Sequence, residues 1–129
     1  MAAKAKKITR PNARGQVGRQ GEDLAADFLQ SKGFSIVERN WHCRAGEIDL
    51  IVERDQVIRF VEVKTRRTTT FGYPEESVSF RKRQRWFRAM EFWLQQRGMT
   101  SARYQADVIS ILWITQEPAI EWIENVEIG

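Results

Sequence analysis

Residues 47–64 read EIDLIVERDQVIRFVEVK, and this stretch predicts a β-hairpin. Two runs rich in Ile, Val and Phe, residues 47–54 and 57–64, flank the dipeptide Asp55-Gln56. This composition is typical of two strands joined by a two-residue loop. With that loop, Asp49 lies opposite Glu62. Lys64 shares their face of the sheet, because side chains alternate along a strand.

This hairpin places two carboxylates side by side. Directly opposed carboxylates lie about 5 Å apart at Cβ and repel each other, which is a poor way to stabilise a sheet. A divalent cation between Asp49 and Glu62 would remove the repulsion. Mg²⁺ is bound by one or two carboxylates together with phosphate oxygens and water, so the chemistry favours a phosphodiester as the partner.

The same residues also allow a structural interpretation, in which Glu62 and Lys64 form a surface salt bridge worth about 0–1 kcal/mol. A Glu-X-Lys triplet is common by chance. The predicted burial of both faces favours a site, because a charged cluster there is only partly solvated. The apolar residues on the Asp49 face are Ile51, Ile58 and Phe60, and those on the opposite face are Ile48, Leu50, Val61 and Val63.

Length and composition indicate one domain. The chain has 129 residues, which suffices for one core and leaves no room for two. No apolar run approaches the roughly 18 residues needed to span a bilayer, and no secretory signal is evident. We therefore expect a cytoplasmic protein without a membrane partner. Residues 1–15 are basic and nearly free of large apolar side chains, so we expect a flexible arm followed by a single domain over residues 16–129.

The chain has one cysteine and one histidine, which are the neighbours His42 and Cys43. A lone cysteine excludes an internal disulfide, and a zinc cluster needs about four ligands. Neighbours on a strand point to opposite faces, so this pair is also a poor nucleophile and base. Carboxylates and lysine remain for chemistry.

Positive charge is concentrated in two segments. Residues 1–21 carry six basic groups and no acid, and residues 64–88 carry eight basic groups against two acids. Fifteen of the 21 basic residues are arginine, whose planar fork suits phosphate. Basic residues beside an acidic cluster suit a site that cleaves phosphodiesters, although a solvated helix face is the alternative. On charge, the expected phosphate contacts are Arg66, Arg67, Arg81, Lys82 and Arg85.

Two helices and three more strands complete the pattern. We expect helices over residues 16–32 and 79–97, each ending at a glycine, and strands over 34–41, 103–114 and 119–126. Residues 68–74 are turn-rich. Glu22 borders the apolar stripe of the first helix, so it either turns inward or is a solvated first-turn acid. Most tryptophans are assigned to the core.

Three motifs carry a family resemblance: GRQGE at residues 18–22, GEIDLI at 46–51 and FVEVKTR at 60–66, with Lys82 on the second helix. Over residues 15–112 the chain resembles the bacterial YraN family, which is considered similar to archaeal Holliday junction resolvases. It looks like the PD-(D/E)XK nuclease superfamily. The resemblance implies an α/β fold with a restriction-endonuclease-like core, ordered helix-strand-strand-strand-helix-strand, whose mixed central sheet is flanked by helices.

The resemblance also implies roles. Asp49 and Glu62 would ligate Mg²⁺ or Mn²⁺, with the Val63 carbonyl as third ligand. Lys64 would orient or activate the attacking water. Glu22 would complete the acidic cluster. The implied activity is a metal-dependent endonuclease acting on DNA, including branched DNA by analogy with the resolvases, and the implied assembly is a homodimer.

Two alternatives stay open, a nucleic-acid-binding module without catalysis and a small adaptor that docks on a protein partner. Glu47 and Asp107 are further acids near the cluster in the pattern. We expect a salt bridge for Glu47 and a strand-end hydrogen bond for Asp107.

Overall fold

The computed structural model describes residues 13–67 and 80–127. Within these residues the chain forms two helices and one five-stranded sheet, in which β3 and β4 are parallel and the other neighbours antiparallel. The elements are α1 (Ala13–Ser31), β1 (Ser35–His42), β2 (Glu47–Arg54), β3 (Val57–Arg66), α2 (Phe80–Gln96), β4 (Arg103–Leu112) and β5 (Ala119–Ile123). The predicted α/β fold with a mixed sheet is therefore confirmed, and it is consistent with a restriction-endonuclease-like core.

The predicted hairpin forms in the predicted register. Strands β2 and β3 pair from Arg54↔Val57 to Leu50↔Val61. The loop residues Asp55 and Gln56 have φ of 55° and 66°. Two consecutive positive φ values are those of a type I′ turn, whose twist matches that of paired strands. The loop thus fixes which residues face each other farther along the hairpin.

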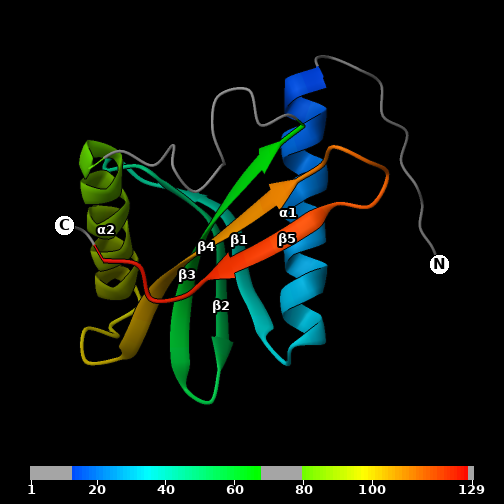
Figure 1. Cartoon of the computed structure of the whole chain (residues 1–129). Coiled ribbons are helices and arrows are strands. Elements are labelled where there is room, and N and C mark those ends of the chain that lie inside the picture. Colours follow the sequence, from blue (N-terminus) through cyan, green and yellow to red (C-terminus); the bar gives the residue numbers. More distant parts are fainter. Residues whose placement is uncertain (1–12, 68–79, 128–129) are drawn as a thin grey trace.

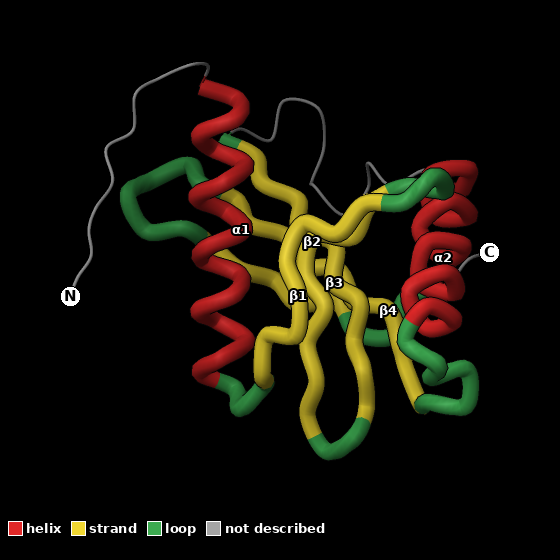
Figure 2. Tube along the Cα trace, turned by 180° about the vertical axis from the view of Figure 1, so that it is seen from behind, coloured by secondary structure: helices red, strands yellow, loops and turns green. Residues whose placement is uncertain are grey.

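The sheet lies between the two helices (Figures 1 and 2). Side chains alternate along the strands, so each face buries its own set of apolar residues. The face under α1 contributes Leu50, Val52, Val61, Ile109 and Ile111, and the face under α2 contributes Ile51, Ile58, Phe60, Ala106 and Val108. From α2, Trp86, Met90, Trp93 and Leu94 are buried against the sheet.

Each helix ends two residues before the glycine that the sequence indicated as its stop. Gly33 and Gly98 have φ of 93° and 65°, a conformation that side-chain-bearing residues rarely adopt. The backbone N–H of Phe34 donates to Leu29 and that of Gly33 donates to Gln30, at 3.1 and 3.0 Å. This pattern is the Schellman motif, which satisfies carbonyls that the helix end leaves open. Gly98 ends α2 in the same way.

Several predicted boundaries need correction. Helix α1 begins at Ala13, so the last three residues of the predicted arm over 1–15 are helical, and residues 1–12 lie outside the described part of the chain. The turn-rich loop over 68–74 lies outside it too. Strands β4 and β5 end at Leu112 and Ile123, before the predicted ends. No described helix is long and apolar enough to cross a membrane.

The alternation of β2 breaks at Asp49. We expected Ile48 to share a face with Leu50, but Ile48 packs in the α2 cluster, whereas Leu50 packs in the α1 cluster. Regular pairing with β3 also ends at Leu50↔Val61 among the described pairs. The backbone of β2 therefore turns where the hairpin ceases to be a regular ladder, and Asp49 is located at that point.

Candidate functional site

Asp49 fills the place where regular pairing of the hairpin stops. Its Oδ2 accepts a hydrogen bond of 2.8 Å from the backbone N–H of Val63. The carboxylate thus satisfies a strand donor that a neighbouring backbone carbonyl would satisfy in a regular sheet. This bond fixes the side chain of Asp49 beside β3, next to Glu62.

The environment of Asp49 disfavours its charge. Burial and the nearby carboxylate of Glu62 raise the pKa of Asp49 to about 8, and Glu22 and Glu47 contribute in the same direction. The hydrogen bond from Val63 opposes this shift because it stabilises the ionised form. A carboxyl group in such surroundings gains from a cation, which would favour its ionised state.

Glu62 and Lys64 lie on β3 and form an ion pair, with 3.4 Å between Lys64 Nζ and Glu62 Oε2. Their side chains are only 15% and 14% exposed, so this pair is not the solvated salt bridge of the structural interpretation. Burial raises the pKa of Glu62, and the charges of Lys64 and Lys82 oppose that shift. A hydrogen bond with Lys64 and partial burial lower the pKa of Lys82. The two lysines and Glu62 are therefore mutual neighbours.

Glu22 reaches the same region from α1. It is half-buried, and burial raises its pKa, while the Asn40 side-chain amide hydrogen-bonds to it and opposes the shift. The inward position is the one observed. The approach of α1 depends on Gly21, because a Cβ there would lie 2.0 Å from Thr65 Oγ1 on β3. This close contact between helix and strand places Glu22 beside the hairpin.

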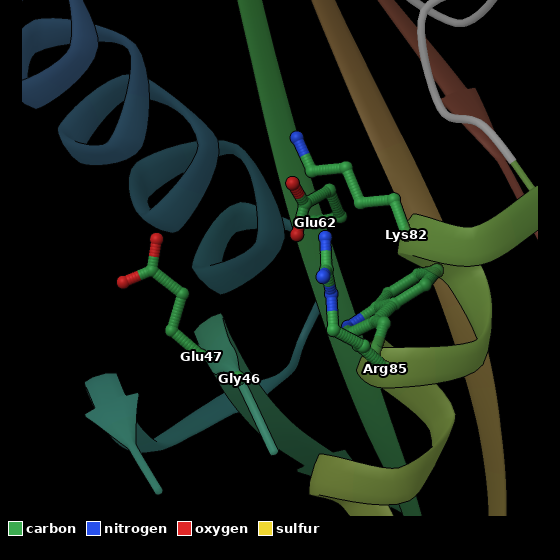
Figure 3. Close-up of a pocket in the computed structure, with 6 residues that line it drawn as sticks. Gly46, Glu47, Glu62, Lys82 and Arg85 are labelled. Atoms are coloured by element: carbon green, nitrogen blue, oxygen red, sulfur yellow. The ribbon is translucent and has the colours of Figure 1, made fainter. Parts of the chain in front are cut away.

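A pocket of about 210 Å³ opens beside Glu62. Figure 3 shows the side chains of Lys82 and Arg85 extending from α2 toward the carboxylate of Glu62, with Gly46 and Glu47 on the other side. The sixth lining residue is Trp86. Strand β3 and helix α2 thus bring an acid and two cations together around one cavity.

The five predicted phosphate contacts divide into two groups. Lys82 and Arg85 line the pocket. Arg66, Arg67 and Arg81 do not line it: Arg66 is half-buried at the end of β3, Arg81 is exposed on α2, and the guanidinium of Arg67 lies 5.7 Å from the ring centre of Trp113. Of the five predicted contacts, Lys82 and Arg85 alone adjoin Glu62 in the pocket.

The other two acids follow the sequence prediction only in part. The charge of Glu47 contributes to the raised pKa of Asp49 and of Glu62, so this residue faces the cluster. Asp107 lies in the middle of β4 and not at a strand end. Glu47 pairs with His42 at 3.1 Å, although it also lines the pocket. Asp107 is fully buried and accepts hydrogen bonds from Arg59, Gln105, Trp122 and the backbone of Asn125. All four bonds are internal, so Asp107 is a structural residue. Sequence reasoning assigned most tryptophans to the core and missed the place of Trp86 in the pocket. Its position next to Arg85 and one turn after Lys82 could have indicated that place.

The donor set can be tested for a metal ion. Within residues 13–67 and 80–127 no group of three or more His, Cys, Asp or Glu side chains gathers as a ligand set. Asp49 and Glu62 remain as two oxygen donors, with the Val63 carbonyl on the same strand as Glu62. Mg²⁺ usually takes one or two carboxylates and completes its shell with water and phosphate, so this pair fits Mg²⁺ but not a closed, all-protein site.

Comparison with known proteins places these residues inside a recognised family region. A family model described as "Uncharacterised protein family UPF0102" matches residues 21–111. A UPF0102 protein of Nocardia farcinica is 42% identical over 125 residues, which cover 96% of this chain and 98% of the relative. A UPF0102 protein of Syntrophomonas wolfei is 47% identical over 97 residues, covering 75% of this chain and 84% of the relative. The matched region includes Glu22, Asp49, Glu62, Lys64 and Lys82.

Proposed function

The chain belongs to the UPF0102 family, and from this premise we propose that it is a Mg²⁺-dependent endonuclease that hydrolyses phosphodiester bonds in DNA. The family membership agrees with the resemblance to YraN proteins. The description of the family assigns no activity, so the proposal depends on the site. The relationship to PD-(D/E)XK nucleases and to junction resolvases stays a prediction.

One observation carries the proposal: Asp49 and Glu62 are largely buried next to each other, and burial raises the pKa of both. Two adjacent buried acids lower the stability of a fold. Pairs of acids with shifted pKa values are therefore found mainly where function requires them. Lys64 and Lys82 beside the pair supply positive charge. Acids with a purely structural role should have their carboxylate oxygens satisfied by internal hydrogen bonds. Asp107 shows this arrangement, because both of its oxygens accept such bonds.

Each residue has a role in the proposed reaction. Asp49, Glu62 and the Val63 carbonyl would hold Mg²⁺ or Mn²⁺. When bound, the metal ion supplies polarisation of the phosphoryl oxygen, a lower pKa for a coordinated water and stabilisation of the leaving oxygen. Lys64 orients the attacking water by hydrogen bonding, and its ion pair with Glu62 holds its Nζ at the site. Glu22 adds negative charge next to Asp49.

The substrate is proposed from charge and from the resemblance. Lys82 and Arg85 in the pocket, with Arg66, Arg67 and Arg81 outside it, would bind successive phosphates of a DNA strand. Branched DNA is the substrate that the resemblance to resolvases suggests, and a homodimer is the matching assembly. Fold alone does not fix substrate, so both rest on analogy.

The test uses variants that keep side-chain shape. Linear, nicked and four-way DNA are incubated with the protein, with and without Mg²⁺. Asp49→Asn and Glu62→Gln are expected to reduce cleavage at least about 100-fold while DNA binding persists. Asp55→Asn is the matched control, because Asp55 is an exposed acid in the turn of the same hairpin, and its activity should equal that of the wild type. Full cleavage by both site variants contradicts the proposal.

A nucleic-acid-binding module without catalysis is the second candidate. The observation that favours it is that no third acid joins Asp49 and Glu62 in a ligand set within the described residues. Salt-sensitive DNA binding without cleavage, unchanged in Asp49→Asn, would support this candidate. Absence of binding even at low salt would leave a protein-interaction adaptor.

A further inference from the structure

One wall of the pocket beside Glu62 is formed by a single turn of α2. Lys82, Arg85 and Trp86 line it, and their spacing of three and four residues puts them on one side of the helix. Figure 3 shows the two cationic side chains extending from this helix over Glu62. All three side chains are hydrogen-bond donors. The wall therefore offers donors to whatever occupies the cavity.

The indole N–H of Trp86 is a hydrogen-bond donor that has no acceptor among the described residues. The residue is 4% exposed, and its indole Nε1 has no hydrogen-bond acceptor among the described residues. Two other indoles of this fold do have one: Trp93 donates to Glu38 Oε1 at 3.1 Å, and Trp122 donates to Asp107 Oδ2 at 2.9 Å. Four other buried side-chain atoms of the described residues also lack a partner, namely Arg59 Nε, Arg66 Nε, Arg83 Nε and Ser110 Oγ, but none of those residues lines this pocket. A buried N–H without an acceptor requires an explanation. Its position in a pocket supplies one, since a ligand can bring the acceptor.

The chemistry of the wall selects the kind of acceptor. Lys82 and Arg85 lie on the same wall as the indole of Trp86 and favour an anionic acceptor over a neutral base carbonyl, while the carboxylates of Glu47 and Glu62 line the rest of the cavity. A non-bridging phosphate oxygen is such an acceptor, because it is anionic and accepts several hydrogen bonds. A cavity of about 210 Å³ is of a size that admits a phosphate group with its ester oxygens.

We propose that Trp86 binds a non-bridging oxygen of the phosphate next to the cleaved one, together with Lys82 and Arg85. This inference rests on the proposed function, because it takes Glu62 as the boundary between the cleavage site and this subsite. Trp86 then fixes the position of the strand by one directed hydrogen bond, while the two cations attract it. Removal of the indole N–H should therefore weaken binding at one phosphate of the strand.

The first experiment measures binding in EDTA, so that cleavage plays no part. Trp86→Phe keeps an aromatic ring and removes the N–H. Fluorescence anisotropy with labelled DNA is expected to show about tenfold weaker binding, the amount that a hydrogen bond to a charged acceptor contributes. Trp93→Phe is the matched control on the same helix, because its N–H bonds to Glu38 outside the pocket. Its affinity should stay within about twofold of the wild type.

A second experiment identifies the phosphate. Methylphosphonate, which replaces one charged oxygen by a methyl group, is placed at successive positions of the DNA. The wild type should lose affinity at the position bound by Trp86, and Trp86→Phe should lose much less there. Equal losses at every position for both proteins overturn the subsite.

The wild-type protein alone provides a third measurement, which remains informative if Trp86→Phe does not fold. The chain has five indole N–H groups, each visible in a ¹H–¹⁵N spectrum. Titration with DNA in EDTA should move the Trp86 signal downfield and leave those of Trp93 and Trp122 in place. An unmoved Trp86 signal on saturation overturns the subsite even when the protein cleaves DNA. Absence of all DNA binding in EDTA overturns the subsite, and absence of cleavage with Mg²⁺ is what overturns the proposed function.

Discussion

Two features of the surroundings of Asp49 have opposite effects on its ionisation. The hydrogen bond from Val63 favours its ionised form, whereas burial and Glu62 favour its protonated form and dominate, since its pKa is about 8. At neutral pH without a cation the folded protein therefore keeps a proton on this group. Retaining such a residue lowers stability, which is a common property of functional sites.

The first prediction concerns the pH dependence of stability. The pKa of Asp49 rises from its ordinary 3.8 to about 8 on folding, so its favourable contribution is complete below about pH 4 and is lost as pH rises toward 8. Asp49→Asn cannot ionise and keeps an acceptor for Val63. We expect the variant to be more stable than the wild type by about 5 kcal/mol at pH 8, with almost no difference near pH 4.

Urea unfolding in EDTA at pH 4, 6 and 8 measures this difference. Asp55→Asn, in the exposed turn of the hairpin, should stay within about 0.5 kcal/mol of the wild type throughout. Added Mg²⁺ should raise the stability of the wild type but not of Asp49→Asn, because a ligand stabilises the state that binds it. A variant less stable than the wild type at pH 8 would show that the acid is needed in its ionised form for folding.

At the scale of elements, the contact between α1 and β3 controls the site. Gly21 leaves no space for a Cβ against Thr65, and the next residue of the helix is Glu22. The neighbouring motif glycine, Gly18, has no atom within 4 Å of the position that a Cβ would occupy, and it carries no such constraint. The distance between helix and sheet at Gly21 therefore decides where Glu22 reaches the hairpin.

The second prediction tests this contact. Gly21→Ala should lower the free energy of unfolding by about 1–3 kcal/mol, because the new methyl group overlaps the side chain of Thr65. Thr65→Ala removes the overlapping atoms, so the double variant should lose less than the two single variants together. Gly18→Ala, in the same helix, should instead stabilise the protein by about 0.5–1 kcal/mol. Equal effects at Gly18 and Gly21 would contradict a packing constraint.

Local patterns predicted the elements well, for reasons visible at particular residues. Alternating side chains and the Asp55-Gln56 loop gave the hairpin register, and the glycines Gly33 and Gly98 gave both helix ends. The approach of Gly21 to Thr65 joins residues far apart in sequence, so no local pattern contains it.

The candidate site was predictable to a similar extent. The hairpin register brought Asp49 and Glu62 together, and the amphipathic pattern placed Lys82 on α2. The shift of Ile48 to the other face was not predictable, because alternation assumes a regular ladder that ends at Leu50. The lack of an acceptor for the N–H of Trp86 was not predictable either. The sequence pattern that places a tryptophan on the buried face of a helix contains no information about nearby acceptors.

At the scale of the whole molecule, a buried polar network joins the last strands to the rest of the sheet. Asp107 on β4 accepts from Arg59 on β3 and from Trp122 on β5, at 3.0 and 2.9 Å. Its other oxygen accepts from the backbone of Asn125, beyond β5. Arg59 also bonds to Glu124 at 2.7 Å. One carboxylate thus fastens the C-terminal segment to the centre of the sheet.

The third prediction separates the buried and exposed parts of this network. Asp107→Asn replaces an acceptor oxygen by a donor that faces other donors, and it leaves Arg59 without its buried partner. We expect a loss of about 3–5 kcal/mol in the free energy of unfolding. Glu124→Gln removes the half-exposed partner of the same arginine and should cost at most about 1 kcal/mol. Thermal unfolding of both variants provides the measurement, and equal losses would contradict the assignment.

The strand order β1-β2-β3-β4-β5 has a consequence for how the chain acquires its fold. The first three strands pair antiparallel with their sequence neighbours, so each pairing closes a short loop and can form while synthesis continues. The parallel pairing of β3 with β4 must wait until α2 has emerged, and its closure loses more chain entropy. We therefore expect the meander of β1, β2 and β3 to gain protection from amide hydrogen exchange early in refolding, and docking of β4 to limit the rate.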